Sequence, residues 1–360
     1  PMIDLLISAL ASGLVSVLDY LSAHVLTCLV PAFFIAGAIA AFVKKEAVLK
    51  YFSPDTPKPV SYGIASVSGT ILAVCSCTIL PIFAGILKKG SGIGPATTFL
   101  YAGPAINVLA IIYTARVLGF DLGVARAVSA VVLAIVIGLL MALLFRSTDV
   151  ETLKRKEMAP GVAGACEAEK PRWVTPAFFA LLIGVLVFGA SQLDWVIRLS
   201  IVYVLTLAIA VLLIYYFDRD EVTDWGLETW DLTKKIFPIL IAGTFLVGII
   251  AFFLPPETFQ PYFGNNSLGA NFLAAVVGTI LYMPTLLEVP IIGTTFGYSS
   301  GIMAAGPALA LLLAGPTVSL PSVLVIYRIV GAKKTAAYVT LVVISATIAG
   351  FVYGNGMLLV

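Results

Sequence analysis

Long apolar stretches recur along almost the whole 360-residue chain, and they constrain its fold more than any other feature. Several run for about 20 residues or more, the length a helix needs to cross roughly 30 Å of hydrocarbon. Only 11% of the residues are charged and 60% are hydrophobic, whereas a soluble domain carries roughly 25% charged residues. Such a chain cannot cover its own surface with polar groups. The sequence therefore predicts an all-α polytopic membrane protein.

The apolar runs predict a first transmembrane repeat at 2–146, a cytoplasmic linker at 147–172, and a region at 173–360 that holds two connecting helices and a second repeat. The linker is polar and carries five basic residues. We expect roughly eight or nine spanning helices, and the sequence leaves open whether the first apolar segment, 3–18, spans the membrane. The other predicted segments are 21–43, 60–88, 93–118, 121–146, 173–192, 196–217, 235–254, 268–298, 302–330 and 335–354.

The two halves resemble each other in register. Residues 71–81 align with 280–290 at an offset of 209, and Ala102-Gly103-Pro104 aligns with Ala314-Gly315-Pro316 at an offset of 212. Short identities are common in apolar sequence, so compositional coincidence is the alternative explanation. The register holds over about 100 residues with proline and glycine in step, which favours an internal repeat.

Charge predicts that the repeats have opposite orientations. The connection at 44–58 and the connection at Lys88-Lys89 are both basic, so both should be cytoplasmic. That requires 60–88 to enter the membrane and return as a re-entrant hairpin that turns near Cys75–Pro81. The matching connections, 255–266 and 298–301, contain no lysine or arginine and should lie outside. The sequence thus predicts inverted repeats with hairpins at 60–88 and 268–298.

Proline and glycine predict interruptions of helices at membrane depth, since proline lacks the N–H that continues a helix. Broken helices whose ends meet at the midplane recur in secondary transporters. General tolerance of these residues in transmembrane helices is the alternative. The predicted helix breaks and gating positions are Pro81, Gly103, Pro104, Pro284, Pro290, Gly315 and Pro316.

Cys75 and Cys77 lie in an apolar run, one residue apart. On a regular helix residues two apart point away from each other, but on an unwound tip the thiols can converge. A disulfide across one residue would be strained, so a shared soft ion or metalloid is the better joint use. Met283 aligns beside them and could add a soft sulfur. Packing as small apolar residues is the alternative.

Glu288 is a carboxylate in the second predicted hairpin, and its aligned position in the first is Ile79, close to the cysteines. A charge at the bilayer centre is costly, so Glu288 should face a cavity or a partner. Because burial disfavours the charged form, Glu288 is a candidate proton carrier; a structural hydrogen bond is the alternative. Asn107, three residues after Pro104, either lines the cavity or caps the broken helix.

The stretches Val74–Gly85, Lys88–Ala96 and Ala102–Asn107 resemble the YraQ/ArsP family of predicted permeases, and the likeness extends into the second half. The resemblance implies a multi-pass permease of the plasma (inner) membrane. The best-known branch of that family exports trivalent organoarsenicals, which bind thiols, and other members are linked to metal or sulfur chemistry. By this likeness Cys75, Cys77, Asn107 and Glu288 are the substrate-site candidates, with Cys75 and Cys77 also as candidate metal ligands.

The predicted function is therefore a secondary-active permease, not an enzyme, that moves a small thiophilic solute by alternating access with proton coupling through Glu288. Its expected partners are that solute, protons and the lipid bilayer. A net charge of +2 gives no argument for nucleic acid, no cofactor is expected, and an oligomer is possible. Two alternatives remain: a membrane thiol–disulfide electron carrier that uses Cys75 and Cys77, and a permease for uptake of a sulfur oxyanion.

Overall fold

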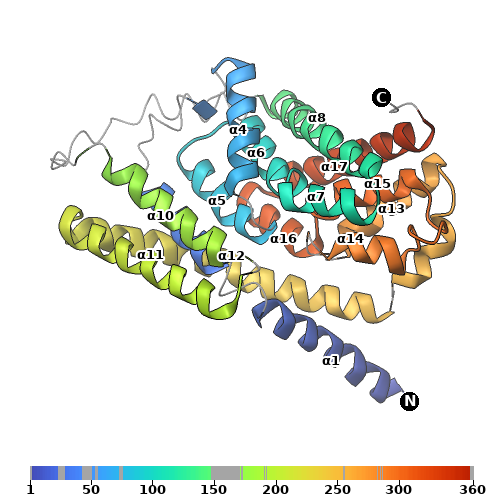
Figure 1. The fold of residues 1–360 in the computed structure, drawn as a ribbon, viewed down its shortest axis with the longest axis horizontal. Helices are drawn as coiled ribbons and strands as arrows, with labels where there is room; N and C mark the ends of the chain where they lie inside the picture. The colour runs from blue at the N-terminus through green and yellow to red at the C-terminus, as the bar shows by residue number, and fades with distance from the viewer. Residues whose placement is uncertain are drawn as a thin grey trace.

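The computed structural model describes residues 2–22, 29–42, 51–52, 56–72, 76–146, 171, 173–189, 191, 193–253, 256–281, 283, 285 and 287–356. It describes no side chains for residues 2–5, 20, 71, 72, 76 and 77. Regular structure in these residues is helical, which confirms the predicted all-α class (Figure 1).

The described part of the first repeat and of the central region consists of helices. They are α1 (Met2–Tyr20), α2 (Val30–Phe42), α4 (Lys58–Leu72), α5 (Ser76–Lys88), α6 (Ile93–Ala105), α7 (Val108–Val117), α8 (Phe120–Leu144), α10 (Val174–Gly189), α11 (Trp195–Tyr216) and α12 (Arg219–Phe253).

The rest of the chain begins with a 3-10 helix and is more irregular at its centre. Its elements are η2 (Pro256–Tyr262), α13 (Leu268–Ile280), α14 (Glu288–Pro290), the π-helical segment η3 (Ile291–Thr295), α15 (Ala305–Ala314), α16 (Leu320–Val330) and α17 (Ala332–Gly354).

Four of the described helices, α8, α11, α12 and α17, are long and apolar enough to cross a membrane. The pair α6 and α7 adds a fifth candidate span, bent by 40° at its break. Shorter apolar helices, among them α2, α13 and α15, accompany them. The chain is therefore a multi-pass membrane protein. Eight or nine crossings stays a prediction, because short helices would have to combine to complete the remaining spans.

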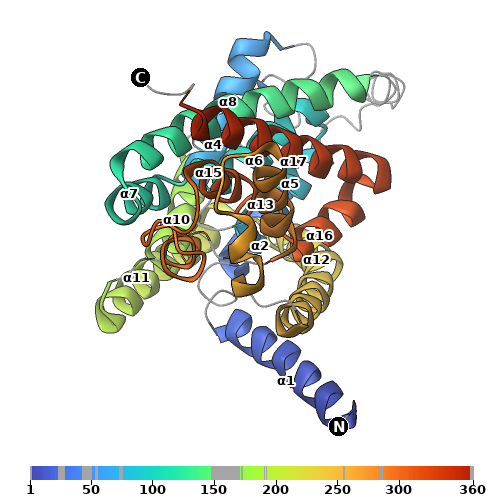
Figure 2. The ribbon, with the colours of Figure 1, turned by 90° about the vertical axis from the view of Figure 1, so that its right-hand side faces the viewer.

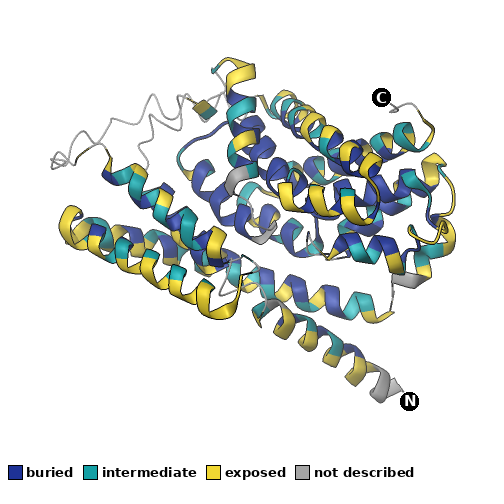
Figure 3. Ribbon diagram, in the orientation of Figure 1, coloured by how far each residue is buried: buried dark blue, intermediate teal, exposed yellow. Residues whose placement is uncertain are grey.

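Burial separates a packed centre from a lipid-facing rim (Figure 3). Every residue of α6 is buried, as expected for a helix that is apolar all round. On α11, by contrast, Ile214 and Tyr215 are each 77% exposed. Large apolar side chains are rarely exposed in contiguous patches to water, so the exposed faces of α11 and of α1 are suited to lipid. Figures 1 and 2 both show α1 extending away from the body.

Helix α12 begins 16 residues before the apolar segment predicted at 235–254. Its polar first half is held by contacts that a hydropathy pattern does not reveal. The Lys88 Nζ at the end of α5 lies 2.7 Å from Glu228 Oε2 and 2.9 Å from Asp231 Oδ2. The Trp225 indole N–H donates to the Phe34 carbonyl at 2.9 Å. These contacts join the polar end of α12 to α5 and α2.

The helix breaks do not all fall at the predicted prolines. Helix α5 runs through Pro81, and α6 runs through Gly103 and Pro104 before it ends at Ala105. The missing N–H of proline therefore did not end either helix. Pro290 is the last residue of α14. Only Gly315 and Pro316 lie within a break, between α15 and α16; Pro284 lies outside the described residues.

Close helix crossings recur at aligned positions of the two repeats. A Cβ atom on Gly69 would lie 3.3 Å from the Gly103 nitrogen, and one on Gly278 would lie 3.1 Å from the Gly315 nitrogen. Both residues of the second crossing are the aligned counterparts of the first, at offsets of 209 and 212. Helix α4 therefore packs on α6 as α13 packs on α15, and small residues let both pairs approach closely.

A second pair of crossings obeys the same offset of 212. Gly94 on α6 meets Gly138 on α8, and Gly306 on α15 meets Gly350 on α17. The glycines that begin α8 and α17, Gly119 and Gly331, are also 212 apart, and both have a positive φ, which suits glycine. The internal alignment thus corresponds to equivalent packing.

The two repeats contact each other through residues at aligned positions. The Tyr101 hydroxyl donates to the Leu313 carbonyl at 3.5 Å, and the two positions are aligned. The counterpart helices α8 and α17 also pack together. Contact between equivalent positions is typical of a two-fold arrangement near its axis. Which way each repeat faces in the membrane stays a prediction.

Candidate functional site

A buried ion pair joins the two repeats. Arg126 on α8 contacts Glu288 on α14 through Nη2 and Oε1, and both side chains are fully buried. Opposite charges at membrane depth normally pair with each other or line a pathway. The structure thus gives Glu288 a partner from the other half of the chain.

Arg126 is positioned by the α7–α8 hairpin. Its Nη1 donates to Thr114 Oγ1 at 2.8 Å, and the Thr114 hydroxyl donates to the Ala110 carbonyl at 2.7 Å. Gly119, with φ +119°, makes the turn between the two helices. A Cβ on Gly123 would lie 2.8 Å from the Ala115 Cα, so the helices approach closely there. These contacts hold the Nη1 side of the guanidinium, and Glu288 contacts its Nη2 atom.

Glu288 lies beside the helix break of the second repeat. A Cβ on Gly315 would lie 3.8 Å from Glu288 Oε2 and 3.5 Å from the Met283 Cε. Met283 and Thr285, in the irregular chain that leads to α14, are buried as well. The Glu288 carboxylate therefore lies close to the Gly315 backbone at the junction of the repeats, and so does the Met283 side chain.

Several polar atoms at this junction lack hydrogen bonds within the described part of the chain. They are the Arg126 Nε and, apart from its ion contact, the carboxylate of Glu288. Unsatisfied buried polar groups are uncommon and costly in folded proteins. Their concentration beside a helix break is a feature expected of a site that binds a ligand.

Asn107 caps α7, one of the two roles that the sequence left open. Its Oδ1 accepts hydrogen bonds from the backbone N–H groups of Leu109 at 3.0 Å and Ala110 at 3.2 Å. Helix α7 carries Thr114 and packs against α14. Asn107 therefore stabilises the helix that positions Arg126.

Cys75 and the side chain of Cys77 lie outside the described part of the chain. Cys75 is not among the described residues, and Cys77 belongs to α5 without a described side chain. Helix α4 ends at Leu72 and helix α5 begins at Ser76, and residues 73–75 between them lie outside the described residues. No group of three or more potential metal ligands occurs among the described residues. The roles of Cys75 and Cys77 in binding a solute or a metal stay predictions.

Arg126 is the functional candidate that the sequence analysis missed. The signal was present, because an arginine inside the apolar segment 121–146 requires a partner. Its aligned position in the second repeat is Tyr338, and the aligned position of Glu288 is Ile79. The ion pair therefore has no equivalent in the other half, which is why the repeat alignment did not reveal it.

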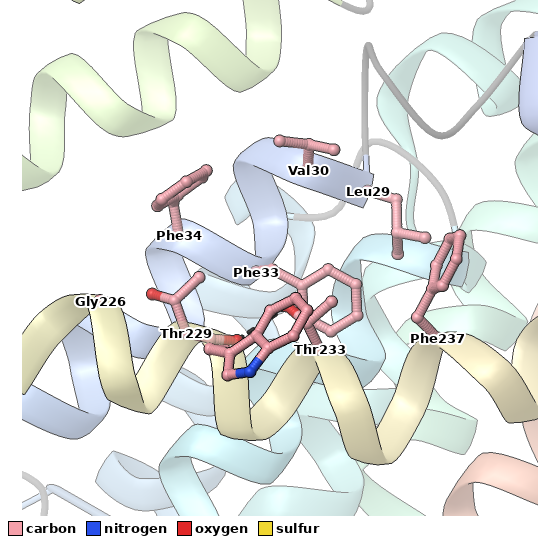
Figure 4. Close-up of a pocket in the computed structure, with 9 residues that line it drawn as sticks. Leu29, Val30, Phe33, Phe34, Gly226, Thr229, Thr233 and Phe237 are labelled. Atoms are coloured by element: carbon pink, nitrogen blue, oxygen red, sulfur yellow. Dashed lines mark hydrogen bonds between the residues drawn. The ribbon is translucent and has the colours of Figure 1, made fainter.

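A separate apolar cavity of about 370 Å³ lies between α2 and the polar half of α12 (Figure 4). Phe33 and Phe34 approach it from α2, and Thr233 and Phe237 from α12. None of the predicted site residues lines it. The cavity and the ion pair are distinct features.

Comparison with known proteins agrees with this architecture. A family model described as a predicted permease, ArsP_1, matches residues 10–355. The chain is 43% identical over 351 residues to the UPF0718 protein MJ0584 of Methanocaldococcus jannaschii, with 94% of each chain covered. It is 24% identical over 277 residues to the UPF0718 protein YraQ of Escherichia coli, covering 77% of this chain and 63% of YraQ. No solved structure matches.

Proposed function

Because this chain belongs to the ArsP_1 family of predicted permeases, we propose that it is a secondary-active permease that moves a small thiophilic solute across the plasma membrane. The solute classes are a trivalent organoarsenical, a soft metal ion and a sulfur compound. Proton movement through Glu288 drives the transport, and the two repeats alternate between inward-open and outward-open arrangements.

The observation that carries the proposal is the buried Arg126–Glu288 pair at the junction of the repeats. A motion of one repeat against the other must rearrange contacts at this junction. Protonation of Glu288 would weaken its attraction to Arg126 and so favour such a motion. The Gly315 break beside Glu288 supplies backbone able to adjust.

The thiophilic character of the solute depends on Cys75 and Cys77. Thiolates select soft centres such as Cu(I), Zn(II) and trivalent arsenic. Met283, buried near Glu288, supplies a further soft sulfur close to the junction. A thiol–disulfide carrier would instead require a reversible two-electron couple of the two cysteines, which a redox titration of the purified protein detects.

Flux into proteoliposomes tests the proposal, with a trivalent methylarsenical, Zn²⁺ and thiosulfate as probes. A pH gradient should drive uptake of at least one probe by the wild-type protein. Glu288→Gln should abolish the response to the gradient, and Cys75→Ser with Cys77→Ser should abolish uptake. Cys166→Ser, in the predicted linker, is the matched control and should transport normally. Gradient-independent flux, or full flux in the double cysteine variant, would overturn the corresponding role.

A further inference from the structure

The guanidinium of Arg126 presents an edge that its present partner does not fill. Thr114 accepts from Nη1, and Glu288 contacts Nη2 through one carboxylate oxygen. The Nε atom has no hydrogen-bond partner among the described residues. Together Nε and Nη2 form one side of a planar fork that can bind two oxygens of an oxyanion in parallel.

Glu288 Oε2 is not used at that edge. This oxygen lies toward Gly315, and within the described chain it has no hydrogen bond. The carboxylate thus occupies the place of an oxyanion without making the bidentate contact. An oxyanion from outside could satisfy both donors at once.

The charge balance of the ion pair requires an anion beside Arg126. The pair is neutral as a unit, and a proton on Glu288 would leave the Arg126 cation buried alone, which is strongly unfavourable. The titratable neighbours cannot replace the lost charge: Tyr101 on α6 lies within electrostatic range of Arg126, and Tyr338 on α17 within range of Tyr101. Both are phenols, uncharged near neutral pH.

A second charged group of α8 acts on other residues in the described structure. Asp121, at the start of α8, interacts with Tyr298 and Tyr353. Arg126 is the charged group that acts on Glu288 in the described structure. An incoming anion is therefore the means of restoring neutrality when Glu288 is protonated.

We infer that the permease takes a small oxyanion, which binds the Nε–Nη2 edge of Arg126 in place of the Glu288 carboxylate when Glu288 takes up a proton. This inference rests on the proposed function, in which Glu288 carries the proton, and it names the class of solute. Proton and oxyanion each favour binding of the other, as linkage requires. Arg126 is then the substrate-binding residue and Glu288 its competitor.

Glu288→Gln tests the inference directly, because a neutral glutamine represents the protonated state. Thermal unfolding in detergent is measured with thiosulfate and with chloride at equal ionic strength. Thiosulfate should raise the Tm of this variant by about 2–4 °C relative to chloride. The matched control is Arg126→Met with Glu288→Gln, which removes both charges and should show no such rise. Equal shifts in the two proteins, or none in Glu288→Gln, would refute the oxyanion site.

A second measurement applies if Glu288→Gln does not fold. Thiosulfate should stabilise the wild-type protein more at mildly acidic than at mildly alkaline pH, because protonation of Glu288 frees the edge of Arg126. The double variant should lose this dependence. Stabilisation that is independent of pH, or that persists in the double variant, contradicts the inference.

The two proposals fail in different ways. If no probe moves into proteoliposomes while thiosulfate still stabilises Glu288→Gln, the oxyanion site stands and the permease mechanism fails. If the methylarsenical moves with the pH gradient while thiosulfate has no effect on Glu288→Gln, the permease mechanism stands and the oxyanion site fails.

Discussion

At the scale of single residues, the Arg126–Glu288 pair explains how two charges are kept in an apolar core. Each charge is buried only because the other compensates it. Thr114 and Asn107 contribute indirectly: the first binds the guanidinium and the second caps the helix that carries Thr114. The site therefore depends on residues that themselves need not contact a solute.

Removing Arg126 alone should destabilise the protein by about 3–5 kcal/mol, because Glu288 is left buried without a counter-charge. Arg126→Met should recover stability as the pH falls, since a protonated Glu288 is neutral. Thermal unfolding of Arg126→Met across pH measures both effects. Arg126→Met with Glu288→Gln should be more stable than Arg126→Met at neutral pH; a less stable double variant would show that the ion pair is not the cause.

Asn107→Ala should cost about 1 kcal/mol or more through loss of the α7 cap. Asn107→Ser is the control, since serine is also a favourable N-cap residue. Chemical or thermal unfolding distinguishes them. If both variants were equally unstable, capping would not be the main role of Asn107.

At the scale of elements, the glycine crossings set how closely the helices pack. Gly69 and Gly278 bring α4 and α13 against the Ala-Gly-Pro elements of α6 and α15. The helix breaks at these elements differ. The break after α6 falls at Ile106–Asn107, beyond the proline, whereas the break after α15 includes Gly315 and Pro316. The aligned sequences of the two repeats thus form equivalent helix crossings, but their helices break at different positions.

Gly306→Ala should destabilise the protein by about 1–3 kcal/mol through overpacking. Its Cβ would lie 2.7 Å from the Gly350 carbonyl oxygen, a backbone atom that cannot rotate away. Gly63→Ala is the matched control, since a Cβ on this helical glycine meets nothing within 4 Å. The control should be neutral or slightly stabilising. Comparable losses of Tm in both variants would contradict the steric argument.

At the scale of the whole molecule, two repeats with matching contacts enclose one asymmetric site. The repeats touch at Tyr101 and Leu313 and along α8 and α17. Helices α10 and α11 pack together beside this body (Figure 1). An approximate two-fold arrangement gives the molecule two related halves, and the ion pair uses one residue from each.

The inverted orientation predicts which connections face outward. In a chain with its native cysteines replaced by serine, a cysteine at Ser299 should react with a membrane-impermeant maleimide on intact cells. A cysteine at Lys333 should react only after the membrane is opened, because basic connections are cytoplasmic. Both native side chains are exposed in the fold. Labelling of both from the same side would refute the predicted orientation.

The pattern of amino acids was enough to establish the class of the protein and much of its internal order. Apolar runs require lipid, and the register at offsets of 209 and 212 located glycines that the fold brings into equivalent crossings. It also singled out Glu288, because a carboxylate in an apolar segment must have a reason to be there.

The folded arrangement was needed to show which residues complete the site. Arg126 and Glu288 are far apart in sequence and occupy non-equivalent positions of the two repeats, so neither spacing nor the repeat could pair them. The polar half of α12 likewise depends on contacts between elements, such as Lys88 with Asp231. Local sequence determines where a helix can form, whereas long-range packing and charge compensation determine how far the helix extends and which residues it contacts.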